Sequence, residues 1–344
     1  MGKVIWIIMR PEGAKAMLFR TETEISPLEH RIVYDDALLF LGSCFADEVG
    51  GICRGLGFNA LVNPFGVLYN PVSIANTIHR LNNGIPFSNK EVIRVGEEFY
   101  CTFNHNTEFW SHSENELLKR VNESLTQAHG HFAQSKWIIL SLGTAWVYRY
   151  LETQEVVANC HKLPSQLFGR FCLSVEAASK CLSSLPQCFP DKHFIFTVSP
   201  LRHLKDGLHG NQLSKSTLLL AVDRVCGQFE NAHYFPAYEI LLDELRDYRF
   251  YKEDMVHPTD QAVHYIWEKF VDFAINPSEI PAMQAASELK QMLHHIPLFP
   301  DSDAYRKFEQ QRNQKITVFT KRFPNVVVDF ESASSEEKKP LYNH

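Results

Sequence analysis

The stretch that decides the fold is Leu38-Leu39-Phe40-Leu41-Gly42-Ser43-Cys44-Phe45-Ala46-Asp47-Glu48. Its apolar half predicts a short buried strand that stops at a glycine, and helix-compatible residues begin directly after Ser43. Such a turn places the Ser43 hydroxyl at the carboxyl end of the strand, beside helix amides that lack an intrahelical acceptor. Open α/β sheets bind their ligands at that edge. The stretch therefore predicts an α/β fold with a functional serine at the rim of its sheet.

A second motif is Asp254-Met255-Val256-His257-Pro258. Proline disfavours helical geometry in the residue before it, so we expect His257 at an extended or turn position. The spacing lets the Asp254 carboxylate reach one ring nitrogen of His257, which leaves the other nitrogen free to take a proton from a hydroxyl. The alternative is that Asp254 caps the turn and His257 is a solvated loop histidine. With Ser43, the motif predicts a catalytic triad of Ser43, Asp254 and His257.

Strand and helix patterns alternate along the chain. Buried runs bounded by turn signals predict strands over 37–41, 137–142 and 194–198. Helical patterns occur over 71–81, 115–129, 174–185, 215–230 and 259–274. This alternation implies a three-layer α/β/α fold with a central parallel sheet covered on both faces. The turns after the strands should then converge on one rim, where Asp254 and His257 also arrive.

Within the 344 residues we expect one large α/β domain over 17–330. The region 60–135 is longer than a single crossover needs, and we expect an insertion there that roofs or narrows the pocket. Helices over 280–294 and 305–322 should form a C-terminal cover. We expect residues 1–16 to be a leader or a disordered extension, and residues 331–344 to be a polar, frayed tail.

Several blocks of the sequence, in order between residues 17 and 320, resemble one known family. They are Gly42-Ser43-Cys44-Phe45-Ala46, Asn63-Pro64-Phe65-Gly66-Val67-Leu68-Tyr69-Asn70-Pro71, Leu142-Gly143-Thr144-Ala145-Trp146, Asn159-Cys160-His161-Lys162, Thr197-Val198-Ser199-Pro200-Leu201-Arg202-His203, Ser214-Lys215-Ser216, and the run from Tyr234 to Asp254 and His257. They resemble the GSCFA family, which is found mostly in bacteria and is similar to the SGNH or GDSL-like hydrolases. The resemblance implies an SGNH-hydrolase-like, flavodoxin-like fold and an esterase or acyltransferase activity, without naming a substrate.

The resemblance also implies an oxyanion hole. SGNH enzymes generally add a glycine amide and an asparagine side chain to the amide of the nucleophilic serine. We expect the amides of Ser43 and Gly66 to serve here. Thr144 stands where the family pattern of SGNH enzymes has the asparagine, and its hydroxyl donates one hydrogen bond with a shorter reach. Asn63 or Asn159 are alternatives for the missing donor.

Cys44 is the alternative nucleophile, because a thiolate at a helix N-terminus would have a depressed pKa. Successive residues at such a turn point in different directions, so only one of the two faces His257. Ser43 occupies the position of the SGNH serine, and Cys44 is expected to pack as a small residue beneath the turn.

Further residues are expected to line the substrate pocket because they follow predicted strands or lie in family blocks. They are Asn63, Asn159, His161, Arg202 and His203. Arg202 suits a carboxylate or phosphate on the substrate. Alternatively, Asn159 and His203 satisfy loop backbone groups. We expect Ser214-Lys215-Ser216 to open and cap the helix predicted over 215–230.

Composition limits the partners. The formal net charge of −6 gives no general attraction to nucleic acid, and the basic, aromatic stretch over 246–252 is better explained as an amphipathic segment that packs its rings. The whole chain is 45% hydrophobic residues and has 25 Phe, which is enough to form an ample core. No run approaches the length of a transmembrane helix. We therefore expect neither a nucleic-acid partner nor a membrane span, and the oligomeric state stays open.

The eight cysteines contain no Cys-x-x-Cys pair, and their scatter predicts reduced thiols in a cytoplasmic protein. Cys160 and His161 are adjacent and would rarely point at one ion, so we expect no metal and no cofactor.

These features together predict a serine hydrolase that removes an O-acyl group, such as acetyl, from a carbohydrate or a small polar metabolite. An O-acyltransferase that uses the same acyl-enzyme is one alternative. A non-catalytic ligand-binding protein on a degenerate SGNH scaffold is another, and Thr144 is the feature in its favour.

Overall fold

A parallel sheet of five strands forms the centre of the protein, in the order β10-β9-β5-β1-β2. Its strands are β1 (Ala37–Gly42), β2 (Ala60–Val62), β5 (Ser135–Leu142), β9 (His193–Val198) and β10 (Ala232–Tyr234). Counted from the first strand of this sheet, the order is the 2-1-3-4-5 of flavodoxin-like folds. The direction of strand winding reverses between β1 and β5, and ligands bind in the crevice at such a switch point.

The structure is a computed structural model that describes residues 20–295, 298–299 and 301–326. The predicted leader over 1–16 and the predicted tail over 331–344 lie outside the described residues.

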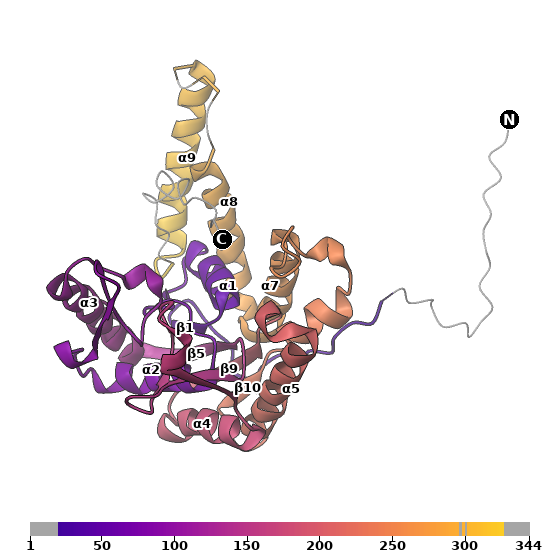
Figure 1. Ribbon diagram of the computed structural model, residues 1–344. Coiled ribbons are helices and arrows are strands. Elements are labelled where there is room, and N and C mark those ends of the chain that lie inside the picture. The colour runs from indigo at the N-terminus through magenta and orange to yellow at the C-terminus, as the bar shows by residue number, and fades with distance from the viewer. Residues whose placement is uncertain (1–19, 296–297, 300, 327–344) are drawn as a thin grey trace, which may run out of the picture.

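Helices cover both faces of the sheet, as Figure 1 shows. The α-helices are α1 (Cys44–Gly55), α2 (Pro71–Asn83), α3 (Glu114–Gln134), α4 (Val175–Cys188), α5 (Gly207–Cys226), α6 (Ala237–Glu239), α7 (Asp260–Ala274), α8 (Ile280–Leu293) and α9 (Asp303–Arg322). One core packs α2, α3, α4 and α5 on one face, and a second core packs α1 and α7 on the other. The predicted three-layer α/β/α fold is confirmed.

The three inner strands β1, β5 and β9 have central apolar runs because both of their faces are buried there. In β1, Leu39 and Leu41 point into the core beneath α2 and α3, whereas Leu38 and Phe40 point into the core beneath α1 and α7. The register aligns Leu39 with Ile138, and Ile138 with Phe194. This alternation fixes which side each turn residue reaches at the end of the strand.

The stretch 60–135 belongs to the central body, and the expectation that it is an insertion over the pocket is wrong. It supplies the edge strand β2 and the layer helices α2 and α3, together with a hairpin of β3 (Val92–Val95) and β4 (Phe99–Thr102). Within this stretch, Tyr69 and Asn70 line the main cavity. The connection between β1 and β5 is thus long because it contains the edge strand β2 as well as helices.

The outer wall of the cavity is a separate antiparallel sheet of three strands, which the sequence patterns did not predict. Its strands are β6 (Trp146–Tyr150), β7 (Val156–Val157) and β8 (Phe168–Cys172), in the order β7-β6-β8. Short 3-10 turns at Leu204–Asp206 and Tyr248–Phe250 lie in the loops after β9 and before α7.

Helix α5 begins earlier than expected, at Gly207, and so the prediction that Ser214 caps it is wrong. Ser214 and Lys215 lie in its middle and are both buried.

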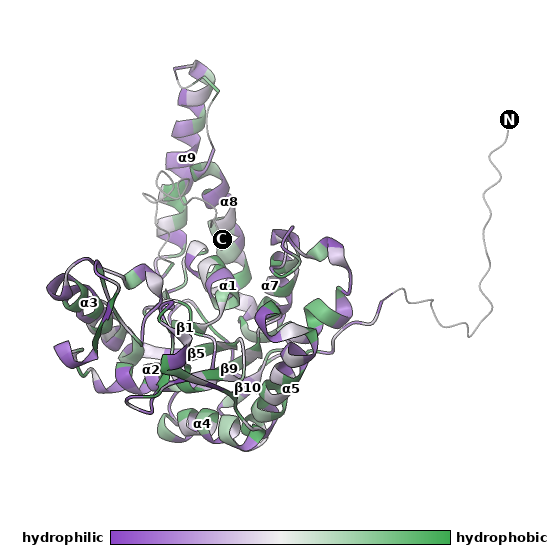
Figure 2. Ribbon diagram, viewed as in Figure 1, coloured by the Kyte–Doolittle hydropathy of each residue, from purple (hydrophilic) through white to green (hydrophobic). Residues whose placement is uncertain are grey.

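At the C-terminal side, α8 and α9 pack against each other and project from the α/β body (Figure 1). Figure 2 shows that the projecting part of α9 is largely hydrophilic, whereas the central strands are hydrophobic. Within the described ranges, no helix combines the length and the apolar character that a bilayer crossing requires.

Candidate active site

Ser43 sits at the turn between β1 and α1, where it caps the helix. Its backbone is extended, and its Oγ accepts a hydrogen bond from the Phe45 amide at 3.3 Å. The hydroxyl also bonds Ser141 Oγ, at the end of β5, at 2.9 Å. The residue is only 2% exposed, yet it lines the main cavity. The sequence thus places a serine at the switch point, as predicted.

Two neighbours shape this turn. Gly42 has φ +138°, and a Cβ there would run into the Ser141 carbonyl, so only glycine fits. The Asn63 side chain accepts from the Gly42 amide at 2.8 Å and donates to Asp47 at 2.7 Å. Because both ends of the Asn63 amide hold the turn against α1, its predicted role as a substrate ligand or oxyanion donor is wrong.

Asp254 orients His257 within one tight loop. One carboxylate oxygen of Asp254 accepts from the amides of Val256 and His257, each at 2.9 Å, and the other oxygen lies 2.5 Å from His257 Nδ1. Desolvation would raise the pKa of Asp254, but the backbone and ring hydrogen bonds of His257 prevail and lower it to about 2. The carboxylate therefore both caps the turn and holds the ring, so the two readings of this motif coexist.

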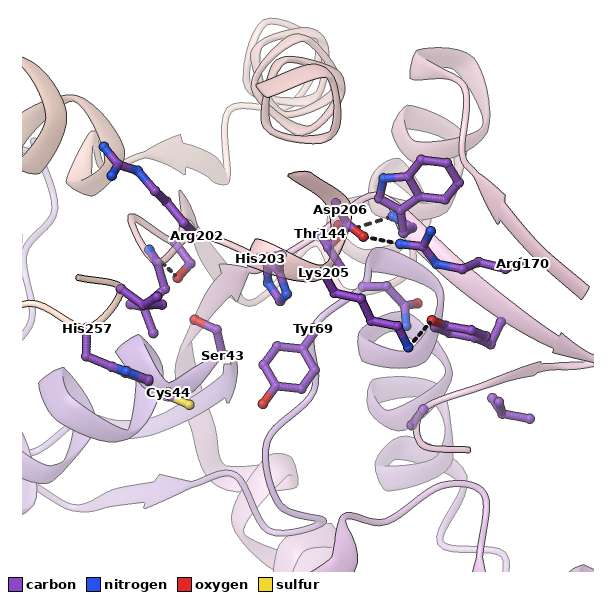
Figure 3. Close-up of a pocket in the computed structure, with 18 residues that line it drawn as sticks. Ser43, Cys44, Tyr69, Thr144, Arg170, Arg202, His203, Lys205, Asp206 and His257 are labelled. Carbon is purple, nitrogen blue, oxygen red and sulfur yellow. Dashed lines mark hydrogen bonds and ion pairs between the residues drawn. The ribbon is translucent and has the colours of Figure 1, made fainter. Parts of the chain in front are cut away.

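Ser43 and His257 line the same cavity, whose volume is about 430 Å³. Figure 3 shows the His257 ring directed toward the side of the cavity where Ser43 and Cys44 lie. Among the described residues, the hydrogen-bond partners of Ser43 Oγ are Ser141 and Phe45, and His257 is not one of them. The structure thus brings Ser43 and His257 to one cavity, with Asp254 behind the histidine, and leaves the serine-to-histidine bond unmade.

Cys44 also lines the cavity, and its sulfur lies near the tip of the His257 ring in the view of Figure 3. Burial and then the charge of Asp47 raise the pKa of the Cys44 thiol. The depressed pKa considered for a thiolate at this helix N-terminus is therefore wrong, and the thiol is a poor rival to the Ser43 hydroxyl.

Two of the predicted oxyanion donors are already engaged. The Ser43 amide donates to the Ser141 carbonyl at 3.0 Å, which extends the β1–β5 ladder by one residue. The Gly66 amide donates to the Asn63 carbonyl at 2.8 Å in a local turn, and Gly66 is not among the residues that line the cavity. Neither amide is free to bind an oxyanion in this conformation, so these two assignments are wrong.

Thr144 lines the cavity as predicted, but its hydroxyl is also engaged. It accepts from the Trp146 amide at 3.1 Å and lies 3.0 Å from Ser214 Oγ. Ser214 Oγ in turn accepts from the Ala145 amide at 2.8 Å. The threonine is therefore better placed to shape the turn after β5 than to replace the amide of an asparagine.

Asn159 and His161 stabilise a neighbouring loop and do not line the cavity. The Asn159 side chain accepts from the His161 amide at 2.8 Å, in a loop where His161 has a positive φ. His161 is fully buried, accepts from Trp110 Nε1 at 2.6 Å and donates from Nε2 to the Thr102 carbonyl at 2.8 Å. Burial lowers the pKa of His161. Their predicted substrate contacts are therefore wrong.

Arg202 and His203 do line the cavity. The His203 ring lies beside Gly143, where a Cβ would approach its Nε2 to 3.2 Å. Burial, followed by the charge of Lys215, lowers the pKa of His203 to about 4, so the ring is neutral near pH 7. Figure 3 shows the ring between Ser43 and Lys205.

Lys215 lies beneath the site and ties two of its turns together. Its Nζ donates to the carbonyls of Gly143 and Ser199, each at 2.6 Å, which are the residues that follow β5 and β9. The side chain is buried, and this burial lowers the pKa of Lys215 to about 7.

Sequence reasoning missed the wall opposite Ser43. Trp146 and Tyr148 project from β6, Arg170 from β8, and Lys205 and Asp206 from the turn after β9. The available signals were the family blocks that end at Trp146 and at His203, since Lys205 lies two residues after the second block. Arg170 had none, because its place depends on pairing between distant strands.

Across the part of the chain that the structure describes, no three His, Cys, Asp or Glu side chains are grouped so that they could hold a metal ion. The eight cysteines are free thiols.

Comparison with known families assigns the chain to a family. The model of the GSCFA family matches residues 37–270, and that of the C-terminal domain of GSCFA domain proteins matches residues 286–338. The chain belongs to the GSCFA family. The GSCFA match spans every segment that forms the cavity, from Ser43 to His257, and the match to the C-terminal domain begins within α8. No curated protein matches the chain.

Proposed function

We propose that this GSCFA protein is a serine hydrolase that cleaves an O-acyl ester, such as an O-acetyl ester, of a carbohydrate or another small polar molecule. One observation carries the proposal: a helix-capping serine and an aspartate-oriented histidine line one cavity at the switch point of a parallel sheet. The likeness of the family to SGNH hydrolases supports the same reaction.

In the proposed reaction, Asp254 accepts from Nδ1 of His257 and leaves Nε2 as the base. His257 takes the proton of Ser43 while the serine oxygen attacks the acyl carbonyl. The proton then passes to the departing alkoxide, which leaves an acyl-enzyme. Water, deprotonated by the same ring, releases the acid and restores Ser43.

The first step requires the Ser43 hydroxyl to exchange its bond to Ser141 for one to His257. One neutral hydrogen bond contributes only about 1 kcal/mol net, so this exchange is a small part of a reaction barrier. Catalytic hydrogen bonds are often unformed without substrate. The side chains of His257 and Asp254 are 43% and 42% exposed, so packing encloses this pair only in part.

For the oxyanion we propose two donors in place of those expected from the sequence. Cys44 is the first residue of α1, so its amide has no intrahelical acceptor. The neutral His203 ring can donate from one nitrogen, as neutral imidazoles do when they polarise a carbonyl. Removal of one such donor typically costs a factor of about 10² to 10³ in rate.

A fluorophosphonate probe tests the proposal, because it reacts covalently only with an activated serine. We expect the wild-type protein and Cys44→Ser to be labelled, and Ser43→Ala and His257→Gln to remain unlabelled. A chromogenic acetate ester should be hydrolysed with the same dependence. Well-folded wild-type protein that takes up no probe and hydrolyses no ester would exclude the hydrolase.

A second function has a specific observation in its favour. The amide and the hydroxyl of Ser43 both bond Ser141, which suits a scaffold that binds a ligand without turnover. Absence of labelling together with measurable ligand binding would favour this binding protein. An acyltransferase would use the same serine and is recognised when added acceptor alcohols divert the acyl group from water.

The free thiols of the protein suit a reducing compartment, so we propose the cytoplasm as the location of the protein.

A further inference from the structure

We propose that the end of the cavity formed by Tyr148, Arg170 and Lys205 binds an anionic group, a carboxylate or a phosphate, of the molecule whose ester reacts at Ser43. The inference rests on the proposed function and names its substrate class: an acyl ester of an acid or of a phosphorylated alcohol. These three residues are called the cationic corner below.

Lys205 is the donor that faces this end of the cavity. Its Nζ donates to the Tyr148 hydroxyl at 3.2 Å and lies 5.6 Å from the centre of that ring. Because the Tyr148 oxygen accepts from Lys205, its own proton remains available for an acceptor. Figure 3 places Lys205 on the side of His203 that faces away from His257, so the corner and the acyl site occupy different parts of one cavity.

The charge of Lys205 has no ion-pair partner in the part of the chain that the structure describes. Asp206, the adjacent residue, is ion-paired with Arg170, and its side chain is only 5% exposed. Among the described residues, no carboxylate lies within ion-pair distance of Lys205. The cavity lining thus carries one acid and three side-chain cations, Arg170, Arg202 and Lys205, in a chain whose net charge is −6. An anion would supply the missing partner.

The corner is held in place before any ligand binds. Tyr148 and Arg170 lie directly opposite each other in the antiparallel pairing of β6 with β8. The Arg170 guanidinium lies 4.1 Å from the centre of the Trp146 ring and 5.6 Å from that of Tyr148. Strand pairing and ring stacking thus hold Tyr148 and Arg170 side by side, and Lys205 bonds Tyr148 from the turn after β9.

Arg202 is not part of the corner. Its guanidinium lies 5.2 Å from the centre of the Tyr251 ring, and Figure 3 shows it turned away from the centre of the cavity, on the side of His257. The anion site therefore depends on Lys205, which distinguishes it from the carboxylate or phosphate contact expected for Arg202 from the sequence.

Direct binding tests the inference without any turnover. Inorganic phosphate and acetate would be titrated into the full-length protein by calorimetry. We expect Lys205→Gln and Tyr148→Phe to weaken phosphate binding, the first by about tenfold, and Lys205→Arg to restore it. Lys180→Gln removes the same charge from an exposed position of α4 outside the cavity and should bind phosphate as the wild type does.

Turnover distinguishes carboxylate from phosphate and separates this inference from the proposed function. Three acetate esters would be compared whose alcohols differ only at one position, which carries a carboxylate, a phosphate or an uncharged amide. We expect an anionic ester to be preferred. Lys205→Gln should raise the KM for that ester about tenfold with little change in kcat, and the KM for the uncharged ester should change little.

The outcomes are distinct. Ser43-dependent hydrolysis with no preference for either anionic ester, and phosphate binding that is unchanged in Lys205→Gln, would overturn the inference and leave the hydrolase standing. Lys205-dependent phosphate binding without hydrolysis of any ester would support the anion site and exclude the hydrolase.

Discussion

At the scale of single residues, Asp254 illustrates how one side chain holds both a loop and a ring. Its two oxygens have separate partners, since one accepts from two backbone amides and the other from His257. An isosteric change can therefore remove the interaction with the ring and keep the turn.

Asp254→Asn should keep the fold and lower the rate of fluorophosphonate labelling by a factor on the order of 10³, because the amide oxygen still caps the turn but the carboxylate no longer fixes the tautomer of His257. Asp247→Asn is the matched control, since Asp247 caps a neighbouring 3-10 turn through the Arg249 amide. Labelling of Asp254→Asn at the wild-type rate would show that the pair is only structural.

Lys215 gives a prediction for stability as a function of pH. Its pKa is about 7 in the folded protein, below the ordinary value of 10.5. Between these values the unfolded chain binds a proton that the folded chain lacks, so raising the pH favours folding. Relative to Lys215→Met, the wild-type free energy of unfolding should rise from pH 7 to 9.5 by up to about 1.4 kcal/mol per pH unit. Below pH 7 the difference should be constant.

Urea denaturation of both proteins across this range measures the slope. Lys180→Met, which changes an exposed lysine of α4, should give a curve parallel to the wild type. A parallel curve for Lys215→Met as well would show that Lys215 keeps an ordinary pKa.

At the scale of elements, the turn between β1 and α1 decides whether the site exists. Gly42, the last residue of β1, needs a positive φ and a close approach to β5, whereas Gly51, within α1, has open space around it. Gly42→Ala should lower the free energy of unfolding by about 3 kcal/mol or more. Gly51→Ala should raise it by up to about 1 kcal/mol, because alanine is the better helix former. Thermal and urea denaturation measure both, and equal effects would refute the role of this turn.

Elements with a strong local signal could be predicted from the sequence. The strands that end at Gly42, Leu142 and Val198 are built around buried apolar runs, so their places and the three-layer fold could be predicted from those runs. The wall of β6 and β8 is partly exposed and pairs across a long loop, so no local pattern marks it.

The site residues can be divided in the same way, into those placed by local sequence and those placed by partners distant in sequence. Ser43 and His257 line one cavity, and Asp254 reaches it only through its hydrogen bond to the His257 ring, as the local turn chemistry of the sequence indicated. Asn63 and His161 have the right chemical groups for a ligand, but buried polar groups are usually satisfied within the protein. Which of the two uses applies depends on partners distant in sequence, such as Gly42 and Trp110, that sequence spacing does not reveal.

At the scale of the whole molecule, α9 contributes little apolar surface, whereas α8 is anchored in the second core through Ala282 and Met283. Phe319 is the buried residue of α9 among those described, and it packs with Ala286 and Leu289 of α8 in a small separate cluster. Segments with few buried contacts open locally at low free energy.

Phe319→Ala should therefore release α9 without unfolding the sheet. Amide hydrogen exchange should become faster over 303–322 and stay unchanged in β1 and β5, with labelling of Ser43 unaffected. Val318→Ala, at an exposed neighbouring position of the same helix, should leave exchange unchanged. Faster exchange in the central strands of Phe319→Ala would mean that α9 is part of the cooperative core.

The order of the strands has a consequence for the newly made protein. Ser43 leaves the ribosome early, whereas His257 follows after more than half of the chain. At about 5 to 20 residues per second, on the order of 10 to 40 seconds separate the two. Until β5 is made, β1 lacks this sheet partner. Until His257 is made, the serine has no base. A polypeptide that ends before His257 would thus be chemically inert toward esters in the cell, and the proposed activity would begin only after about three quarters of the chain has been made.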